Sequence, residues 1–201
     1  MRVVSARSRA RLLLVFVLLC VSVGLGGVRS PAVARAVTGN LLVNGSFELG
    51  TNPGDSFSTL QSGSTAIAGW TVTRVSIDYI GGLWQASLGG RSLDLDGSPG
   101  PGGIAQRFTT MPGRSYQVTF DLAGNPGGPP AVKRLGVRAA GQQAGFTFNS
   151  TGRSYNAMGW TRRAWTFKAT GKTTTLEFYS LDTAGGSCGP TLDNVSVMLL
   201  G

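Results

Sequence analysis

Seven residues in the middle of the chain alternate strictly between apolar and polar, and this pattern constrains the fold more than any other part of the sequence. The apolar positions are Tyr116, Val118, Phe120 and Leu122, and each residue between them is polar. A period of two residues is typical of a β-strand with one buried face and one face in water. Antiparallel sheets can leave one face in water, so the pattern favours antiparallel pairing.

The same pattern recurs in short segments that are separated by turn residues. The residues from Gly45 to about Ser64 are polar and predict a loop, and no stretch has the 3.6-residue apolar period of a helix. Short strands at this spacing predict an all-β fold, and we favour a β-sandwich centred on Arg91–Asn125. The other strands are expected at Asn40–Asn44, Ala66–Thr73, Val75–Ile80, Lys133–Ala140, Ala144–Asn149, Arg162–Ala169, Thr173–Ser180 and Thr191–Leu199.

The first 36 residues have the composition of a secretory signal peptide. Basic residues up to Arg11 precede an apolar run, Leu12–Val28, and small-x-small cleavage signals follow at Ala32–Ala34 and Ala34–Ala36. A retained membrane anchor is the alternative, but three glycines end the apolar run early. We therefore expect a signal peptide at 1–36, one domain at 37–201, and a secreted, extracellular product without membrane contact after cleavage.

Removal of that segment changes the charge of the protein. Six of the 18 basic residues and none of the nine acidic ones lie in it, which leaves 12 basic residues, nine acidic residues and a net charge of +3. No compact Lys/Arg cluster with interleaved aromatic residues is present, so we expect no nucleic-acid partner. We also expect a monomer.

One cysteine remains after cleavage. Cys20 lies in the apolar run, and Cys188 is then the single thiol of the domain. The fold therefore cannot depend on an internal disulfide bond, although a secreted protein could form one. We expect Cys188 to be buried, with a free thiol or a bond between chains as alternatives.

Several segments together resemble a known family. They are Asn40–Glu48, Gly69–Trp70, Val75–Ile80, Arg91–Gly97, Gly103–Phe108, Tyr116–Asn125 and Cys188–Val197. With these segments the chain is similar to the DUF642 family, whose bacterial members are often labelled choice-of-anchor C, and they follow the family's order over nearly all of the domain. The resemblance implies a galactose-binding-like jelly-roll β-sandwich, the fold of many carbohydrate-binding modules, and a cell-wall or extracellular polysaccharide as partner.

Catalysis is restricted by the absence of histidine from the whole sequence. Ser-His-Asp, Cys-His and His-metal mechanisms are therefore excluded. A two-carboxylate glycoside hydrolase remains possible in principle, and strand geometry places Asp94 and Asp96 about 7 Å apart on one face. Nothing nearby indicates an apolar pocket that would raise one pKa, so we expect both on a solvated outer face. The other candidate carboxylates are Asp78 and Asp121.

The resemblance also implies a structural calcium ion. Sandwich modules of this type often hold Ca²⁺ where the first and last strands lie side by side, and carboxylate and carbonyl oxygens suit this ion. The residues at the corresponding positions are Glu48 and Asp193, with the Gly45 carbonyl as a third ligand. The alternative is that Glu48 and Asp193 cap loops by accepting hydrogen bonds from backbone N–H groups.

Sugar binding requires an aromatic ring on which a pyranose can stack, with polar groups at its rim. Trp84 is one candidate, because Gln85 and Tyr79 are close to it in the sequence and it lies in a glycine-rich loop with an exposed character. A core position for Trp84 stays equally open. Trp70 and Trp165 lie in alternating strands, and we expect them in the core.

A second aromatic candidate lies further along the chain. Tyr155 and Trp160 are close in sequence to Asn156 and Arg162, and Asn125 at a strand end could supply an amide. For Trp160 we favour a structural position at the rim of a site.

These observations leave three hypotheses for the function. The first is a secreted, non-catalytic carbohydrate-binding module that recognises cell-wall or extracellular polysaccharide. The second is a structural or protein-interaction protein of the cell envelope. The third is a glycoside hydrolase with an uncommon carboxylate pair.

Overall fold

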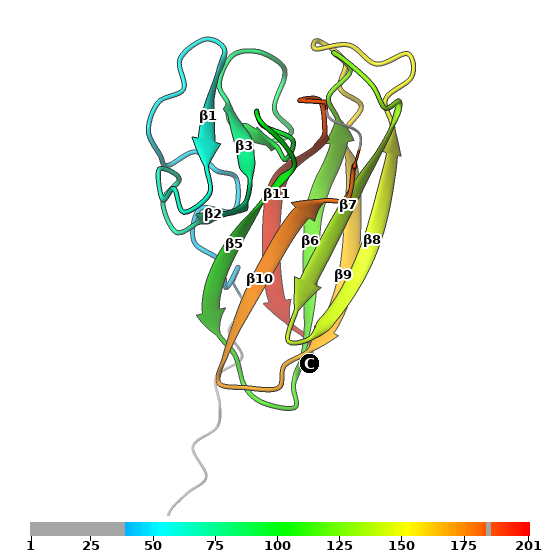
Figure 1. The fold of residues 1–201 in the computed structure, drawn as a ribbon. Helices are drawn as coiled ribbons and strands as arrows, with labels where there is room; N and C mark the ends of the chain where they lie inside the picture. The colour runs from blue at the N-terminus through cyan, green and yellow to red at the C-terminus, as the bar shows by residue number, and fades with distance from the viewer. Residues whose placement is uncertain (1–38, 184–185) are drawn as a thin grey trace, which may run out of the picture. The chain divides into compact units, whose positions relative to one another are not determined.

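A computed structural model of the protein describes residues 39–183 and 186–201, which form two β-sheets packed face to face (Figure 1). The predicted signal peptide lies outside these residues. In the described part of the chain, no helix has the length and apolar character that a membrane span requires. The strands are β1 (Phe57–Gln61), β2 (Thr71–Arg74), β3 (Ser76–Ile80), β4 (Ser92–Asp94), β5 (Gly102–Thr109), β6 (Ser115–Gly124), β7 (Val132–Ala139), β8 (Gln142–Asn149), β9 (Thr161–Lys168), β10 (Thr173–Ser180) and β11 (Pro190–Leu199).

Every strand pair in the two sheets is antiparallel. The six-stranded sheet has the order β1-β3-β4-β11-β6-β9, and the five-stranded sheet has the order β2-β5-β10-β7-β8. The chain crosses between the sheets repeatedly, so that β10 lies between β5 and β7 while β11 lies between β4 and β6. The predicted jelly-roll β-sandwich is confirmed.

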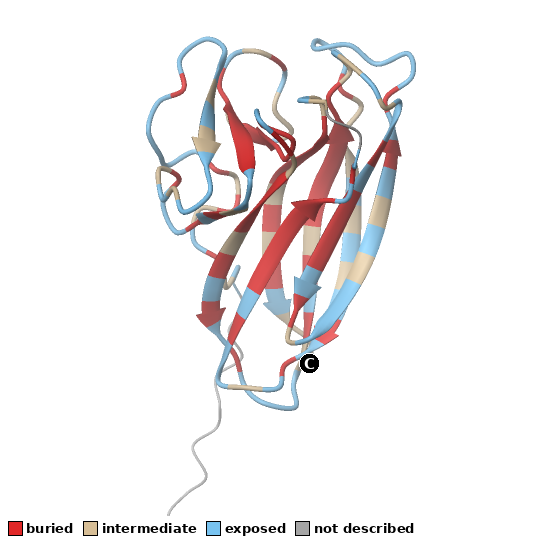
Figure 2. Cartoon of the chain, viewed as in Figure 1, coloured by how far each residue is buried: buried red, intermediate tan, exposed pale blue. Residues whose placement is uncertain are grey.

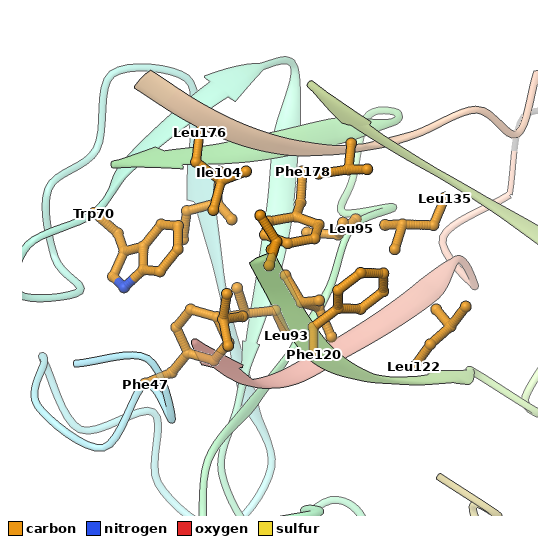
Figure 3. Packing of buried hydrophobic residues seen from close by; sticks show 14 of the residues in the cluster. Phe47, Trp70, Leu93, Leu95, Ile104, Phe120, Leu122, Leu135, Leu176 and Phe178 are labelled. Atoms are coloured by element: carbon orange, nitrogen blue, oxygen red, sulfur yellow. The ribbon is translucent and has the colours of Figure 1, made fainter. Parts of the chain in front are cut away.

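The core lies between the sheets and is built by the alternation seen in the sequence. Tyr116, Val118, Phe120 and Leu122 of β6 are all buried. Figure 3 shows Phe120 close to Phe178 of the opposite sheet, and the two ring centroids are 4.9 Å apart. Burial of each large apolar side chain contributes roughly 1.5–3 kcal/mol, so this interdigitated layer is the main source of stability.

The segment Asn40–Asn44 is not a strand, and that prediction is wrong. Asn44 has a φ of 54°, and its side-chain amide donates to the carbonyls of Leu49 and Ala68, which turns the chain instead of extending it. The segment is nevertheless attached to β11. The Asn40 side chain bonds the backbone of Val195 and Val197, which takes the place of a strand ladder.

The predicted loop between Gly45 and Ser64 contains one strand that the sequence did not reveal. β1 is an edge strand that pairs only with β3, and its residues alternate between exposed and half-buried. An edge strand of this kind buries little apolar area, so its sequence has the polar composition of a loop.

Candidate functional site

Four loops meet at one end of the sandwich, at the top of Figure 1. They follow β3, β6, β8 and β10 and comprise residues 81–91, 125–131, 150–160 and 181–189, of which 184 and 185 are not described. Between them lies a pocket of about 150 Å³. Its lining includes the side chains of Trp84, Asp94, Asn125, Tyr155 and Cys188.

Trp84 forms an inner wall of this pocket. Its side chain is only 4% exposed, and its indole N–H donates to the hydroxyl of buried Ser92 at 2.9 Å. The loop therefore does not display Trp84 to solvent, and of the two alternatives the core position is correct. Its ring centroid lies 5.9 Å from that of Tyr155 with a 38° tilt between the planes, so Trp84 backs Tyr155 from below.

Tyr155 is the accessible aromatic residue of the site. Its side chain is 37% exposed. It lines the pocket and also an open hollow of about 250 Å³ that Arg153 and Pro126 line as well. Tyr155 therefore borders two hollows, and part of its surface is open to solvent.

Gln85 and Trp160 attach the two aromatic loops to each other. The Gln85 backbone N–H donates to the Tyr155 carbonyl at 3.1 Å, and the indole N–H of Trp160 donates to the Gln85 carbonyl at 2.9 Å. Trp160 is half-buried and packs on the core. These contacts agree with the structural rim position favoured for Trp160. Gln85 makes both of them with its backbone N–H and carbonyl groups.

Asn125 forms the polar floor of the pocket. Its side-chain amide donates to Asp94 Oδ2 at 2.7 Å, and its side-chain carbonyl accepts the N–H of Gly127 at 2.8 Å. Because both ends of this side chain already have partners, Asn125 fixes the shape of the floor. A ligand that displaced these contacts would leave buried polar groups unpaired.

Asp94 and Asp96 are buried, and the prediction of a solvated outer face is wrong for both. The segment before β11 covers them: the Gly189 N–H donates to Asp94 at 2.9 Å, and a β-carbon at Gly189 would come within 2.5 Å of the Asp96 carboxyl carbon. Burial raises the pKa of Asp94 to about 8 and that of Asp96 to about 6. The burial of these two acids could not be predicted from local alternation, because the segment that covers them is distant in the sequence.

The predicted pair of Asp94 and Asp96 does not form a catalytic cleft. Asp94 and its cross-strand partner Asp78 contribute to the pocket wall, but Asp96 does not, so Asp94 and Asp96 do not flank a common open space. Asp78 accepts the Thr59 hydroxyl at 2.6 Å, and Asp121 accepts Arg162 at 3.1 Å. These carboxylates hold strands and loops together.

Lys133 supports the site from inside, and the sequence analysis missed it. Its side chain is fully buried, and its ammonium group donates to the carbonyls of Gly128 and Cys188, which joins two of the four loops. Burial lowers its pKa. A signal was available, because Lys133 falls on the same face of its strand as Leu135 and Val137.

Cys188 is half-buried beside the pocket, and it has no disulfide partner among residues 39–183 and 186–201. The prediction of a buried thiol is therefore only partly correct. Burial raises the pKa of the thiol, so the reactive thiolate is disfavoured.

Tyr79 does not belong to the pocket, and its placement beside Trp84 as a binding residue is corrected by the structure. Its side chain is 1% exposed, and its hydroxyl donates to the Phe47 carbonyl at 2.5 Å. Tyr79 belongs to the hydrophobic core, and all the residues of its strand, β3, are buried.

The three predicted calcium ligands already accept hydrogen bonds. Glu48 accepts the N–H groups of residues 90 and 91, Asp193 accepts those of residues 87, 88 and 194, and the Gly45 carbonyl accepts that of Val195. Among the residues described, no group of three or more Cys, Asp or Glu side chains has the geometry of a metal site. These contacts fit the loop-capping alternative better than they fit Ca²⁺, and the calcium hypothesis stays a prediction.

The sequence of residues 40–198 matches the family described as "Protein of unknown function (DUF642)". The chain belongs to the DUF642 family. This match confirms the resemblance noted in the sequence and covers nearly all of the folded domain.

Two relatives of this DUF642 protein differ in the share of their length that the chain covers. Halomucin of Haloquadratum walsbyi is 33% identical over 87% of this chain, which corresponds to 2% of halomucin. The L-galactono-1,4-lactone-responsive DUF642 protein of Arabidopsis thaliana is 25% identical over 84% of this chain, which corresponds to 45% of the plant protein. The chain thus spans about half of the plant relative and a small part of halomucin.

Solved structures share the fold of this DUF642 protein at low sequence identity. An arabinose-bound MgGH51 α-L-arabinofuranosidase superimposes with a TM-score of 0.55 and 15% identity over 80% of this chain and 26% of that enzyme. A family 16 carbohydrate-binding module reaches a TM-score of 0.49 and 16% identity over 79% of this chain and 99% of the module. The likeness to the arabinofuranosidase concerns the fold over the part of that enzyme that is covered.

Proposed function

We propose that this DUF642 protein is a secreted, non-catalytic carbohydrate-binding module whose ligand contacts Tyr155. The observation that supports the proposal is the convergence of two aromatic segments on one pocket. Trp84 and Tyr155, which are 71 positions apart, pack with ring centroids 5.9 Å apart, and the ring of Tyr155 remains open to solvent.

The arrangement has the chemistry that sugar recognition requires. A pyranose presents a C–H face that stacks on an aromatic ring and hydroxyls that need polar partners at the rim. Tyr155 offers the ring, Arg153 and Ser154 line the open hollow beside it, and the rigid layer of Trp84 and Asn125 supports it from below. A ring held in place before binding loses little conformational entropy when the ligand arrives.

The absence of histidine supports a binding role over hydrolysis, and the two carboxylates that line the pocket, Asp78 and Asp94, accept hydrogen bonds from Thr59 and Asn125. The second hypothesis, a protein-interaction role in the cell envelope, predicts instead that no glycan binds. Secretion is part of the proposal and has its own test, because the N-terminus of the protein recovered from culture supernatant should follow Ala34 or Ala36.

The binding test compares wild type with Tyr155→Ala and Tyr155→Phe in affinity electrophoresis on neutral polysaccharides and in pull-downs on insoluble ones. We expect Tyr155→Ala to weaken binding at least tenfold, and Tyr155→Phe to retain most of it because the ring is kept. Leu88→Ala, an exposed residue of the 81–91 loop, is the matched control. Retention of wild-type affinity by Tyr155→Ala, or no binding by wild type to any glycan, would contradict the proposal.

A further inference from the structure

The outward face of the five-stranded sheet is strongly basic. Its strands contain a single acidic residue, Glu177, while Arg74, Arg107, Arg134 and Arg138 are exposed on it. We call these four arginines the arginine face. Their charge together with that of Glu177 is +3, which equals the net charge of the whole domain after residue 36. Of the other acidic residues, Asp182 lies beside this face, because it accepts the backbone N–H of Arg134 at 3.1 Å.

Strand register brings these side chains to one side of the sheet. Leu176 and Phe178 of β10 point into the core, so Glu177 between them points outward. Arg138 of β7 is paired directly with Glu177, and Arg107 of β5 is paired with Thr175 on the other edge of β10. Arg134 shares the face of Arg138 because it is four residues away on the same strand.

The centre of the face is a rigid polar cluster. Glu177 is 3% exposed and accepts the Thr73 hydroxyl at 2.8 Å and Arg74 Nε at 3.2 Å, and it forms an ion pair with Arg138 Nε. Thr73 and Arg74 are consecutive, and regular alternation would send them to opposite faces. The φ of 66° at Arg74 turns its guanidinium back, so that it lies 3.8 Å above the Tyr179 ring.

The ion pairs with Glu177 leave most N–H donors of Arg74 and Arg138 available. Both pairs with Glu177 use Nε, so the terminal nitrogens of Arg74 and Arg138 are not part of them. The two side chains are 36% and 59% exposed. Beside Arg138 lies a hollow of about 360 Å³ that Gln143 and Thr175 also line, which adds amide and hydroxyl groups to the charged donors.

We propose that the arginine face is a second binding surface, separate from the Tyr155 pocket, and that its ligand is a carboxylated polysaccharide built from uronate units. Guanidinium groups bind carboxylates through paired N–H donors, and the interleaved Thr and Gln side chains suit sugar hydroxyls. The proposal specifies a ligand class that the proposed function leaves open, and it does not depend on Tyr155.

The spacing of the charges indicates a polymer as the ligand. Strand geometry separates Arg134 from Arg138 by about 13 Å and Arg107 from Arg138 by about 10–12 Å across two strands. A chain with repeated carboxylates can contact several of these positions at once. Nucleic acid fits less well, because Tyr179, the aromatic side chain that points outward on β10, is 8% exposed and is covered by Arg74, so no ring is available for base stacking.

The test is affinity electrophoresis of the domain in gels that contain polygalacturonate, neutral galactan or double-stranded DNA. The variant Arg107→Gln/Arg134→Gln removes two charges from the face without disturbing the Glu177 pairs. Arg114→Gln/Lys168→Gln removes two exposed charges elsewhere and is the matched control. Circular dichroism melts show whether each variant is folded.

We expect polygalacturonate to retard wild type, the control double variant and Tyr155→Ala alike, with binding that weakens as salt increases. The Arg107→Gln/Arg134→Gln variant should bind at least tenfold more weakly and keep its affinity for neutral glycans. If both double variants lost the same affinity for polygalacturonate, binding would depend on the net charge of the domain alone, and the proposal would be overturned. Equal retardation by DNA, or no retardation of wild type by polygalacturonate, would also overturn it, and neither result concerns the Tyr155 pocket.

Discussion

The ring of Tyr179 lies across the backbone of Gly136 on the neighbouring strand, so closely that a β-carbon at position 136 would come within 2.4 Å of two ring carbons. Arg74 lies over the same ring at 3.8 Å from its centroid. Tyr179 is thus held between Gly136, which has no side chain, and the guanidinium group of Arg74. This packing holds Arg74 beside Glu177 on the outward face of the five-stranded sheet. Figure 2 shows that most residues of the central strand, β10, are buried.

Gly136→Ala should displace the Tyr179 ring and disturb the arginine face. We expect a loss of roughly 1–3 kcal/mol in the free energy of unfolding from overpacking, together with weaker binding of polygalacturonate. Gly145→Ala is the matched control, because Gly145 is the register partner of Gly136 and a β-carbon there meets nothing closer than 3.8 Å. Urea titration of both variants measures the difference, and equal stability of the two would contradict the packing described.

Trp84→Ala should destabilise the fold far more than its loop position suggests. Removing a buried tryptophan costs about 3–5 kcal/mol, and Ser92 would lose its partner. Leu88→Ala in the same loop, at a side chain that is 49% exposed, should stay within about 0.5 kcal/mol of wild type. Thermal and urea unfolding check both values, and a Trp84→Ala variant as stable as Leu88→Ala would exclude the structural role.

The stability of the domain should fall as the pH rises from 5 to 8. Burial raises the pKa of Asp94 to about 8 and that of Asp193 to about 7, whereas both carboxyls ionise near pH 4 in the unfolded chain. Between these values the folded state holds a proton that the unfolded state has lost, so each group lowers the free energy of unfolding by about 1.4 kcal/mol per pH unit.

Asp94→Asn isolates the contribution of Asp94 to this slope. The variant should be less stable at pH 5, because its new amide faces the Asn125 amide, but its stability should depend less on pH than that of wild type. Urea titrations at pH 5, 6, 7 and 8 give the two slopes. Identical slopes for wild type and Asp94→Asn would show that Asp94 ionises at its ordinary pKa.

Loop capping and calcium binding predict different results for Asp193→Ala. If Asp193 caps residues 87 and 88, the variant loses roughly 1–3 kcal/mol because two N–H groups lose their acceptor, and the loss is the same in calcium and in chelator. We expect this result. A melting temperature of wild type that rises in millimolar Ca²⁺, with no rise in Asp193→Ala, would instead establish the calcium site.

The sequence predicted the parts of the fold that depend on regular alternation. The apolar positions of β6 are buried as expected, and the same rule placed β9, β10 and β11 to within one or two residues. Trp70 is buried and Trp165 packs on the core, also as expected. These elements bury one continuous face, and their side chains therefore carry the period of the strand.

The site was only partly predictable because it is made of loops. Trp84, Asn125, Tyr155 and Trp160 were all named from the sequence, and the structure brings them together at one end of the sandwich. Which ring faces solvent depends on how four loops cover one another. Local composition indicated an exposed Trp84, whereas the structure buries its ring and pairs its indole N–H with Ser92.

The attachment of Asn40 and Leu41 to Val195 and Val197 has a consequence beyond stability. The first described residues and the last strand therefore lie side by side. Such a unit can be grafted into a surface loop of an unrelated host without pulling apart the host's own chain. New termini opened in the turn around Gly141, with the old ends joined, should give a circularly permuted protein that still folds.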